Sequence, residues 1–126
     1  MHRQWLFNAT CDRVVDGDTL VCRVDLGFKV SAAVTVRLRG VNAPEIDTAQ
    51  GKEASDWMER LLLGGDKPLP LMVQSYKDRL SFARWVCDVW DAQQLLRLTE
   101  AKKAGDDALL AKKLIDSGHG VPLNVP

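Results

Sequence analysis

The sequence predicts an α+β fold that is mainly β: a five-stranded barrel with about three helices, formed by residues 1–126 as a single domain. Three observations lead to this prediction. Apolar and polar residues alternate with a period of two in the first part of the chain, which is typical of strands. The pattern then changes to helical spacing, and two more strand-like stretches and further helical patterns follow. A chain of 126 residues suits one hydrophobic core.

The first part of the chain is predicted to form a three-stranded antiparallel meander. A short extended stretch covers Ala9–Val15, and Asp16-Gly17-Asp18 then signals a turn. Alternation over Leu20–Leu26 gives a second strand, and Gly27 makes the next turn. Alternation over Val34–Leu38 gives the third strand.

A helix is predicted next, over Glu53–Leu63, and Gly64-Gly65 ends it. Its apolar side chains recur at helical spacing and form one face: Ala54, Trp57, Met58, Leu61 and Leu62. Leu69–Ser75 is predicted as a fourth strand, with Pro68 and Pro70 restricting its start to a sheet edge. Trp85–Trp90 is rich in aromatic and β-branched residues and is predicted as the fifth strand.

The remaining chain is predicted to be helical, over Gln93–Ala104 and again over Asp107–Asp116, with a break at Gly105. Five short strands with a helix after the third suit a small closed barrel of the OB type. Three of the four tryptophans are expected in its core: Trp57, Trp85 and Trp90.

Composition limits the function classes. Formal net charge is zero, which argues against a strong non-specific nucleic-acid binder but allows an enzyme with a local basic cleft. The three cysteines, Cys11, Cys22 and Cys87, are odd in number and are expected to be buried thiols. No segment is apolar enough to suggest a membrane span or a signal peptide, so a cytoplasmic location is expected.

Two short stretches carry the polar residues of greatest interest. Asp16-Gly17-Asp18-Thr19 offers two carboxylates to a hard cation such as calcium, although the same residues also favour a plain hairpin turn. Arg37 has a guanidinium suited to phosphate oxygens, whereas Arg39 is expected to face solvent. Glu45 follows Pro44, which could hold its carboxylate in place; otherwise it is an ordinary loop residue.

Further candidates precede the fifth strand. Arg84 is either a phosphate ligand or a surface residue at the strand end. Lys77 and Arg79 form a charged loop that contacts either solvent or a nucleic-acid backbone. Phe82 is included with them as a candidate for contact with nucleic acid.

Taken in order, these motifs resemble the staphylococcal nuclease (thermonuclease) family. The matching stretches are D-G-D-T, R-L-x-G-V-x-A-P-E, G-K-E-A-S at a helix start and A-R-W at a late strand, within a span of roughly Ala9 to Val121. The resemblance implies a five-stranded OB barrel. It also implies calcium-dependent cleavage of DNA and RNA that leaves 3′-phosphate ends, with single-stranded DNA or RNA as substrate.

The resemblance also implies roles for individual residues. Glu45 would act as general base, and Arg37 and Arg84 would grip the phosphate and stabilise its transition state. The calcium ligands would be Asp18, Asn42 and the backbone carbonyl of Ala43, with Asp16 near the metal.

The chain departs from the family pattern in four places. Asn42 replaces an aspartate and so removes a negative charge from the metal site, and weak calcium binding is expected. Phe82 replaces a tyrosine, and Ala83 replaces a glycine. Residues 91–106 form a longer segment than in the family's type member, either a partner surface or an extended loop and helix. The alternative to a nuclease is therefore a weak or inactive nuclease-like module that binds nucleic acid or protein.

Overall fold

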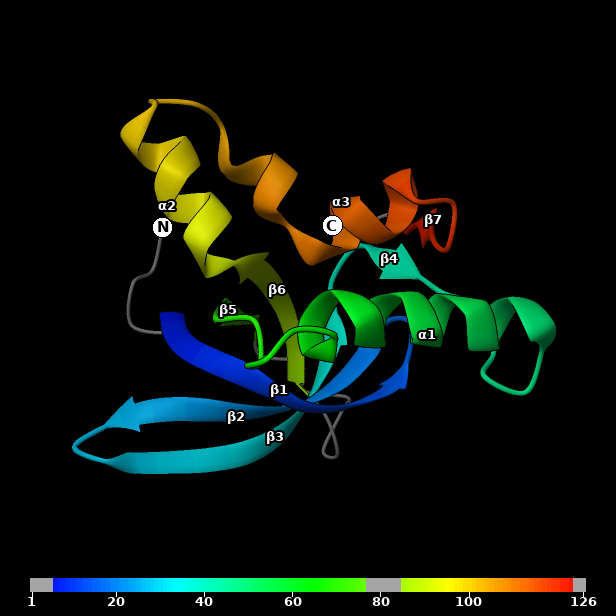
Figure 1. Ribbon diagram of the computed structural model, residues 1–126, viewed down its shortest axis with the longest axis horizontal. Helices are drawn as coiled ribbons and strands as arrows, with labels where there is room; N and C mark the ends of the chain where they lie inside the picture. The colour runs from blue at the N-terminus through cyan, green and yellow to red at the C-terminus, as the bar shows by residue number, and fades with distance from the viewer. Residues whose placement is uncertain (1–5, 77–84, 124–126) are drawn as a thin grey trace.

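The computed structural model describes residues 6–76 and 85–123, and a closed barrel of five strands forms its centre (Figure 1). The strands follow one another around the barrel in the order β1 (Leu6–Asp16), β2 (Thr19–Gly27), β3 (Val30–Leu38), β6 (Trp85–Asp91) and β5 (Leu71–Tyr76). β5 pairs back with β1 to close the ring. Neighbours are antiparallel except β3 and β6, which are parallel. The predicted α+β barrel of OB type is thereby confirmed.

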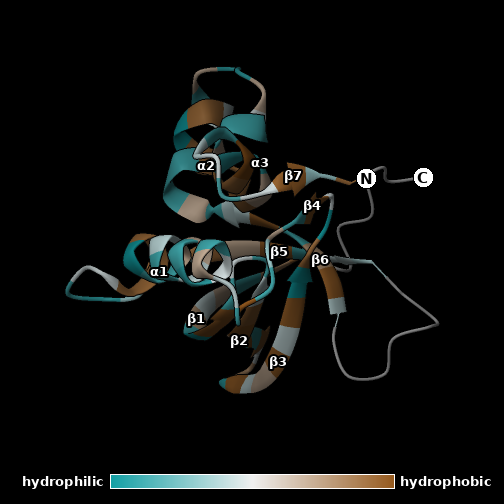
Figure 2. Ribbon diagram, turned by 90° about the vertical axis from the view of Figure 1, so that its right-hand side faces the viewer, coloured by the Kyte–Doolittle hydropathy of each residue, from teal (hydrophilic) through white to brown (hydrophobic). Residues whose placement is uncertain are grey.

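The other elements surround this barrel. A small two-stranded sheet joins β4 (Val41–Asn42) to β7 (Val121–Pro122) near the end of β3. Helix α1 (Ala49–Leu63) lies against β1, whereas the helices that follow β6 gather on another side of the barrel (Figures 1 and 2). Those later elements are α2 (Ala92–Glu100), the 3-10 helix η2 (Gly105–Ala108) and α3 (Leu110–Asp116). Among the described residues, no helix is long and apolar enough to cross a membrane.

Helix α1 begins earlier than the predicted Glu53, at Ala49. Thr48 caps it, because the hydroxyl oxygen of Thr48 accepts a hydrogen bond from the backbone N–H of Gly51. The helix buries Ala54, Met58 and Leu62 in the core.

The helix predicted over residues 107–116 is divided in two. Leu109 is extended (φ −73°, ψ 125°) and forms a β-bridge with Trp90, so the chain leaves the 3-10 helix before α3 begins. The helix predicted over residues 93–104 ends early, at Glu100, and Lys102 then adopts a positive φ of 56°.

The three cysteines are buried as predicted, but not every tryptophan that was predicted to lie in the core does so. Cys11, Cys22 and Cys87 are all buried, and burial raises the pKa of the Cys22 thiol to about 12. Trp57 is half-buried and packs against the core, as expected. Trp85 is not a core residue, because 46% of it is exposed where β6 begins.

Candidate functional site

The turn between β1 and β2 presents a carboxylate in a fixed position. Asp18 is only 6% exposed. One of its oxygens accepts the Thr19 hydroxyl hydrogen at 3.0 Å, and the other accepts the backbone N–H of Ala43 at 2.8 Å. The backbone N–H of Asp18 donates to the carboxylate of Asp16 at 3.1 Å, so the two acidic side chains lie together at this turn.

Gly17, between the two aspartates, allows α1 to pack onto the turn. A Cβ atom at this position would stand 2.8 Å from the Cβ of Ala43 and 2.9 Å from that of Ala54. Both distances are shorter than real Cβ contacts, so a side chain here would push the helix or the loop away. Glycine at residue 17 therefore serves close packing, in addition to the turn that the sequence predicted.

Arg37, near the end of β3, reaches across to this turn. Its Nη1 donates to the carbonyl oxygens of Leu38 and Val41, both at 2.9 Å, and lies 3.5 Å from Asp18 Oδ2. Its Nη2 donates to the Asn42 side-chain oxygen at 3.3 Å. The guanidinium is thus held on several sides, and only 15% of the Arg37 side chain is exposed.

The structure brings five of the sequence-predicted site residues together. Asp16 and Asp18 come from the β1–β2 turn, Arg37 from β3, and Asn42 and Ala43 from β4 and the residue after it. The pairing of Asn42 with Val121 in β7 anchors this end of the loop. Residues far apart in the sequence therefore meet at one end of the barrel.

The two carboxyl groups differ in their affinity for protons. Burial and a hydrogen bond to the Asp18 side chain raise the pKa of Asp16 to about 6. Burial acts in the same direction on Asp18, but the hydrogen bonds from Asp16 and Ala43 and the nearby Arg37 charge outweigh it and lower the pKa of Asp18. Below about pH 6, Asp16 is therefore mainly protonated, whereas Asp18 keeps its charge to lower pH than Asp16 does.

Glu45 lies in the loop that leads from this cluster to α1. Its backbone carbonyl accepts hydrogen bonds from the backbone N–H and the hydroxyl of Thr48, at 3.0 Å and 2.6 Å. Its side chain is exposed and has no hydrogen bond or ion pair with the described part of the chain. The carboxylate is thus attached to a fixed backbone but is available to solvent.

Four predicted residues lie outside the described residues: Lys77, Arg79, Phe82 and Arg84. Arg39 was expected to face solvent, and 31% of its side chain is exposed, but it also has partners within the protein. Its guanidinium stacks 4.5 Å from the Tyr76 ring centroid and lies 3.7 Å from Asp88 Oδ2, so it belongs to a separate cluster on β5 and β6.

Two neighbours of the site were not among the predicted residues. Thr19 fixes the orientation of Asp18, and the D-G-D-T motif contained the signal for it. A pocket of about 210 Å³ lies beside Asn42 and Ala43, and His119 lines it. The His119 ring also packs on Trp57, with ring centroids 5.7 Å apart. A single histidine between two glycines gave no sequence pattern that would have placed it here.

The available donors suit calcium. The carboxylates of Asp16 and Asp18 and the amide oxygen of Asn42 are oxygen ligands of the kinds that hard cations such as calcium prefer, and all three side chains already accept hydrogen bonds within the protein. Burial, followed by the neighbouring Asp18, raises the pKa of Asp16, so a second negative charge is disfavoured at this turn. No group of three or more His, Cys, Asp or Glu side chains is placed to hold a metal within residues 6–76 and 85–123, so the charge of the donor set is low.

Comparison with known proteins adds no family assignment. No protein-family model matches the chain, and no curated protein matches it.

Proposed function

We propose that this protein is a calcium-dependent phosphodiesterase that hydrolyses single-stranded DNA or RNA and leaves 3′-phosphate ends. One observation carries the proposal: the guanidinium of Arg37 is held in place 3.5 Å from the carboxylate of Asp18, whose backbone N–H is bonded to the carboxylate of Asp16. A cation held by oxygen donors next to a fixed guanidinium is an arrangement suited to the phosphoryl group of a phosphodiester.

Arg37 keeps donors for a substrate. Three hydrogen bonds hold its guanidinium, to Leu38, Val41 and Asn42, and they involve only the two Nη atoms. An arginine carries more N–H groups than these three bonds use, so some guanidinium N–H donors are left to bind phosphate oxygens. Because the internal bonds fix the guanidinium before substrate arrives, little entropy is lost when it binds.

Calcium would be held by Asp18, by the amide oxygen of Asn42 and by the carbonyl of Ala43, with Asp16 close by. Bound there, it would supply positive charge against the phosphoryl oxygens. Glu45 is proposed to accept the proton of the attacking water, which its exposed side chain on an anchored backbone would allow. Arg84 is proposed to bind the same phosphate as Arg37.

The alternative is a module that binds nucleic acid or protein without cutting it. The observation that favours it is the identity of residue 42: Asn42 brings no charge, and its side-chain oxygen already accepts a hydrogen bond from Arg37. A weakly held cation would leave the phosphate charge poorly compensated.

End-labelled single-stranded DNA and RNA, incubated with calcium or with chelator, would test the proposal. We expect shortened products only with calcium, and their 3′ ends should lose a phosphate on treatment with a phosphatase. The variants Arg37→Lys and Glu45→Gln should cut far more slowly, whereas Arg23→Gln, whose guanidinium pairs with Asp12 on the surface, should cut normally. Binding without cleavage in calcium would favour the alternative, and neither binding nor cleavage would reject both.

A further inference from the structure

The hairpin of β2 and β3 ends in an unusual turn. The sequence placed this turn at Gly27, but Phe28 and Lys29 form its centre, with φ of 54° and 62°. Two-residue hairpin turns with positive φ at both positions strongly favour Asn-Gly, because bulky side chains are strained there. Phenylalanine at the first position therefore weakens the hairpin.

The same phenylalanine is fully exposed. The relative exposure of Phe28 is 101%, and Leu26 and Val30 on either side are 47% and 54% exposed. The hairpin of β2 and β3 projects beyond the rest of the barrel (Figure 1), and Phe28 lies in the turn at its end, between Gly27 and Val30. Phe28 destabilises the folded protein in two ways, through its strained backbone and through its exposed apolar ring. Its presence is best explained by a contact that the ring makes with another molecule.

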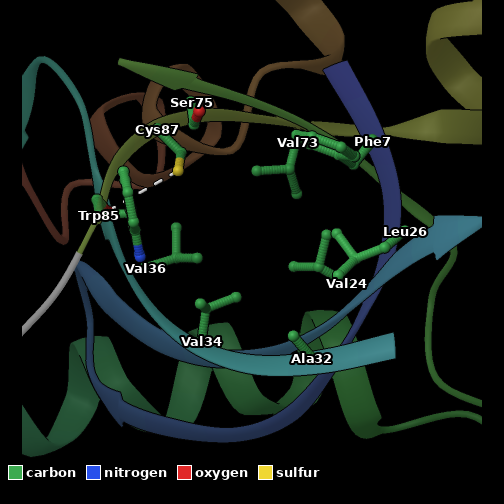
Figure 3. Close-up of a pocket in the computed structure, with 10 residues that line it drawn as sticks. All are labelled: Phe7, Val24, Leu26, Ala32, Val34, Val36, Val73, Ser75, Trp85 and Cys87. Carbon is green, nitrogen blue, oxygen red and sulfur yellow. Dashed lines mark hydrogen bonds between the residues drawn. The ribbon is translucent and has the colours of Figure 1, made fainter. Parts of the chain in front are cut away.

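A cavity of about 210 Å³ opens at the mouth of the same barrel (Figure 3). Side chains from all five barrel strands point into it, among them Phe7, Val34, Val73 and Trp85. Leu26 forms part of its edge. Its lining is almost entirely apolar, and apolar cavities of about 150 Å³ already accommodate a benzene ring. The cavity therefore has room for a phenylalanine side chain.

We propose that Phe28 of one copy of this protein inserts into the barrel cavity of a second copy, and that the exchange is reciprocal. The projecting ring and the cavity occur on one chain, and Leu26 belongs to both surfaces. A twofold axis between two hairpins can fill both cavities at once, which closes the assembly as a dimer. Phe28 cannot be filling its own cavity, since its ring is fully exposed.

Charge is compatible with a second copy as the partner. The net charge of the chain is zero, so no long-range repulsion opposes self-association. Asp25 and Lys29 are both exposed beside Phe28, and neither has an ion-pair partner within the part of the chain that the structure describes. In an antiparallel arrangement of two hairpins, the lysine of each copy meets the aspartate of the other.

The expected dimer is weak. A phenylalanine buries about 150–250 Å². Two such rings, together with the surrounding contacts of Leu26, Val30 and Trp85, would bury less than about 1,200 Å² of surface in total. This area is at the small end of the range for specific complexes. Weak and transient complexes lie at this small end, so we expect a dissociation constant of about the micromolar range. The Asp18 and Arg37 cluster lies at the opposite end of β2, so the proposal does not depend on the proposed nuclease function.

Sedimentation velocity over a wide range of protein concentration would test the proposal. We expect a monomer–dimer equilibrium for the wild-type chain. Phe28→Asn should raise the dissociation constant at least about 100-fold, because two equivalent contacts are lost and each contributes about tenfold or more. Asparagine tolerates positive φ, so the same variant should melt at a higher temperature than wild type when both are dilute.

A second variant tests the cavity. Ala32 faces into it, so Ala32→Phe should fill the space with the chain's own ring and also give a monomer. Ala32→Leu fills less of the space and should weaken the dimer less. The Phe28→Asn variant keeps its cavity, and the Ala32→Phe variant keeps its Phe28. A mixture of the two variants should therefore form heterodimers, although neither variant dimerises alone. Leu96→Asn, at an apolar position on α2 that is 59% exposed, should leave the dimer unchanged.

Several outcomes would overturn the proposal. These are a wild-type chain that stays monomeric at every concentration, a dimer that survives Phe28→Asn, and a mixture that forms no heterodimer. A monomer whose binding to anionic vesicles or to single-stranded oligonucleotides is lost in Phe28→Asn would reject self-association and assign the exposed ring to that ligand instead.

Discussion

The carboxylate of Asp18 accepts a buried hydrogen bond of 2.8 Å from the backbone N–H of Ala43. This bond joins the β1–β2 turn to the loop that leads from β4 toward Glu45. The same carboxylate oxygen lies 3.5 Å from Nη1 of Arg37. One buried side chain therefore sets the relative positions of the proposed metal donors, the guanidinium proposed to bind phosphate and the loop that carries the proposed base.

Gly17 should tolerate no side chain. Gly17→Ala places a methyl group within 3 Å of Ala43 and Ala54, so we expect a loss of about 1–3 kcal/mol in unfolding free energy, measured by urea denaturation. Gly65→Ala is the matched control, because the nearest atom to its new Cβ is the Lys67 carbonyl oxygen at 3.7 Å. Equal stability of the two variants would contradict the close packing of α1 on the turn.

Arg37 and Glu45 should separate stability from catalysis. Arg37→Ala leaves the Leu38 and Val41 carbonyls without their donor and should cost about 1–3 kcal/mol of stability. Glu45→Gln removes no bond seen in the described structure and should melt as wild type does. Both should slow cleavage by about 10²–10⁴-fold. Wild-type cleavage rates in both would place the reaction elsewhere in the protein.

Asp16 should make the calcium-free protein less stable as pH rises. Its pKa is about 6 in the folded chain against an ordinary value of 3.8, so the folded state binds this proton more tightly than the unfolded state does. The stabilising contribution of protonated Asp16 is present below about pH 4 and is lost as pH rises through 6. Asp16→Asn should flatten this slope in chelator and raise the melting temperature at pH 8. An unchanged slope would show that Asp16 is not the group that titrates.

Calcium binding should be tuned by residue 42. Asn42→Asp adds a charge at nearly constant shape, so we expect it to lower the calcium concentration needed for half-maximal binding. Calorimetric titration of both forms measures this directly. Equal or weaker binding by the aspartate variant would mean that residue 42 does not face the metal.

Calcium should also compete with the proton on Asp16. Binding ought to weaken below about pH 6, and it ought to release a proton when titrated in buffers of different ionisation enthalpy near that pH. Asp16→Asn should abolish the released proton. A binding constant that does not change with pH would separate Asp16 from the metal site.

Most of the fold was predictable because its signals are local. Strand alternation in the meander and the apolar stripe of α1 follow from side-chain geometry within each element. The boundaries were less accurate wherever a single contact decided them. Thr48 starts α1 before its apolar stripe begins, and the bridge from Leu109 to Trp90 divides the last helix.

The errors concern contacts between distant segments. Arg39 has the same local pattern as Arg37, but it contacts the Tyr76 ring and the Asp88 carboxylate, which are distant from it in the sequence. Trp85 has the composition of a core residue and nevertheless lies at the cavity mouth, where the barrel is not filled. The grouping of Asp18, Arg37 and Asn42 came from motif order, since no periodicity could have brought these three segments together.

The pairing of β3 with β6 has a consequence for synthesis of the chain. β1 and β3 are the outer strands of the meander, and each is completed only by a strand from residues 71–91. On the ribosome, the first half of the chain would therefore expose two unpaired strand edges until those residues emerge. A nascent chain that has emerged from the ribosome only as far as about residue 66 should aggregate or recruit a chaperone. A chain that has emerged beyond residue 91 should resist protease.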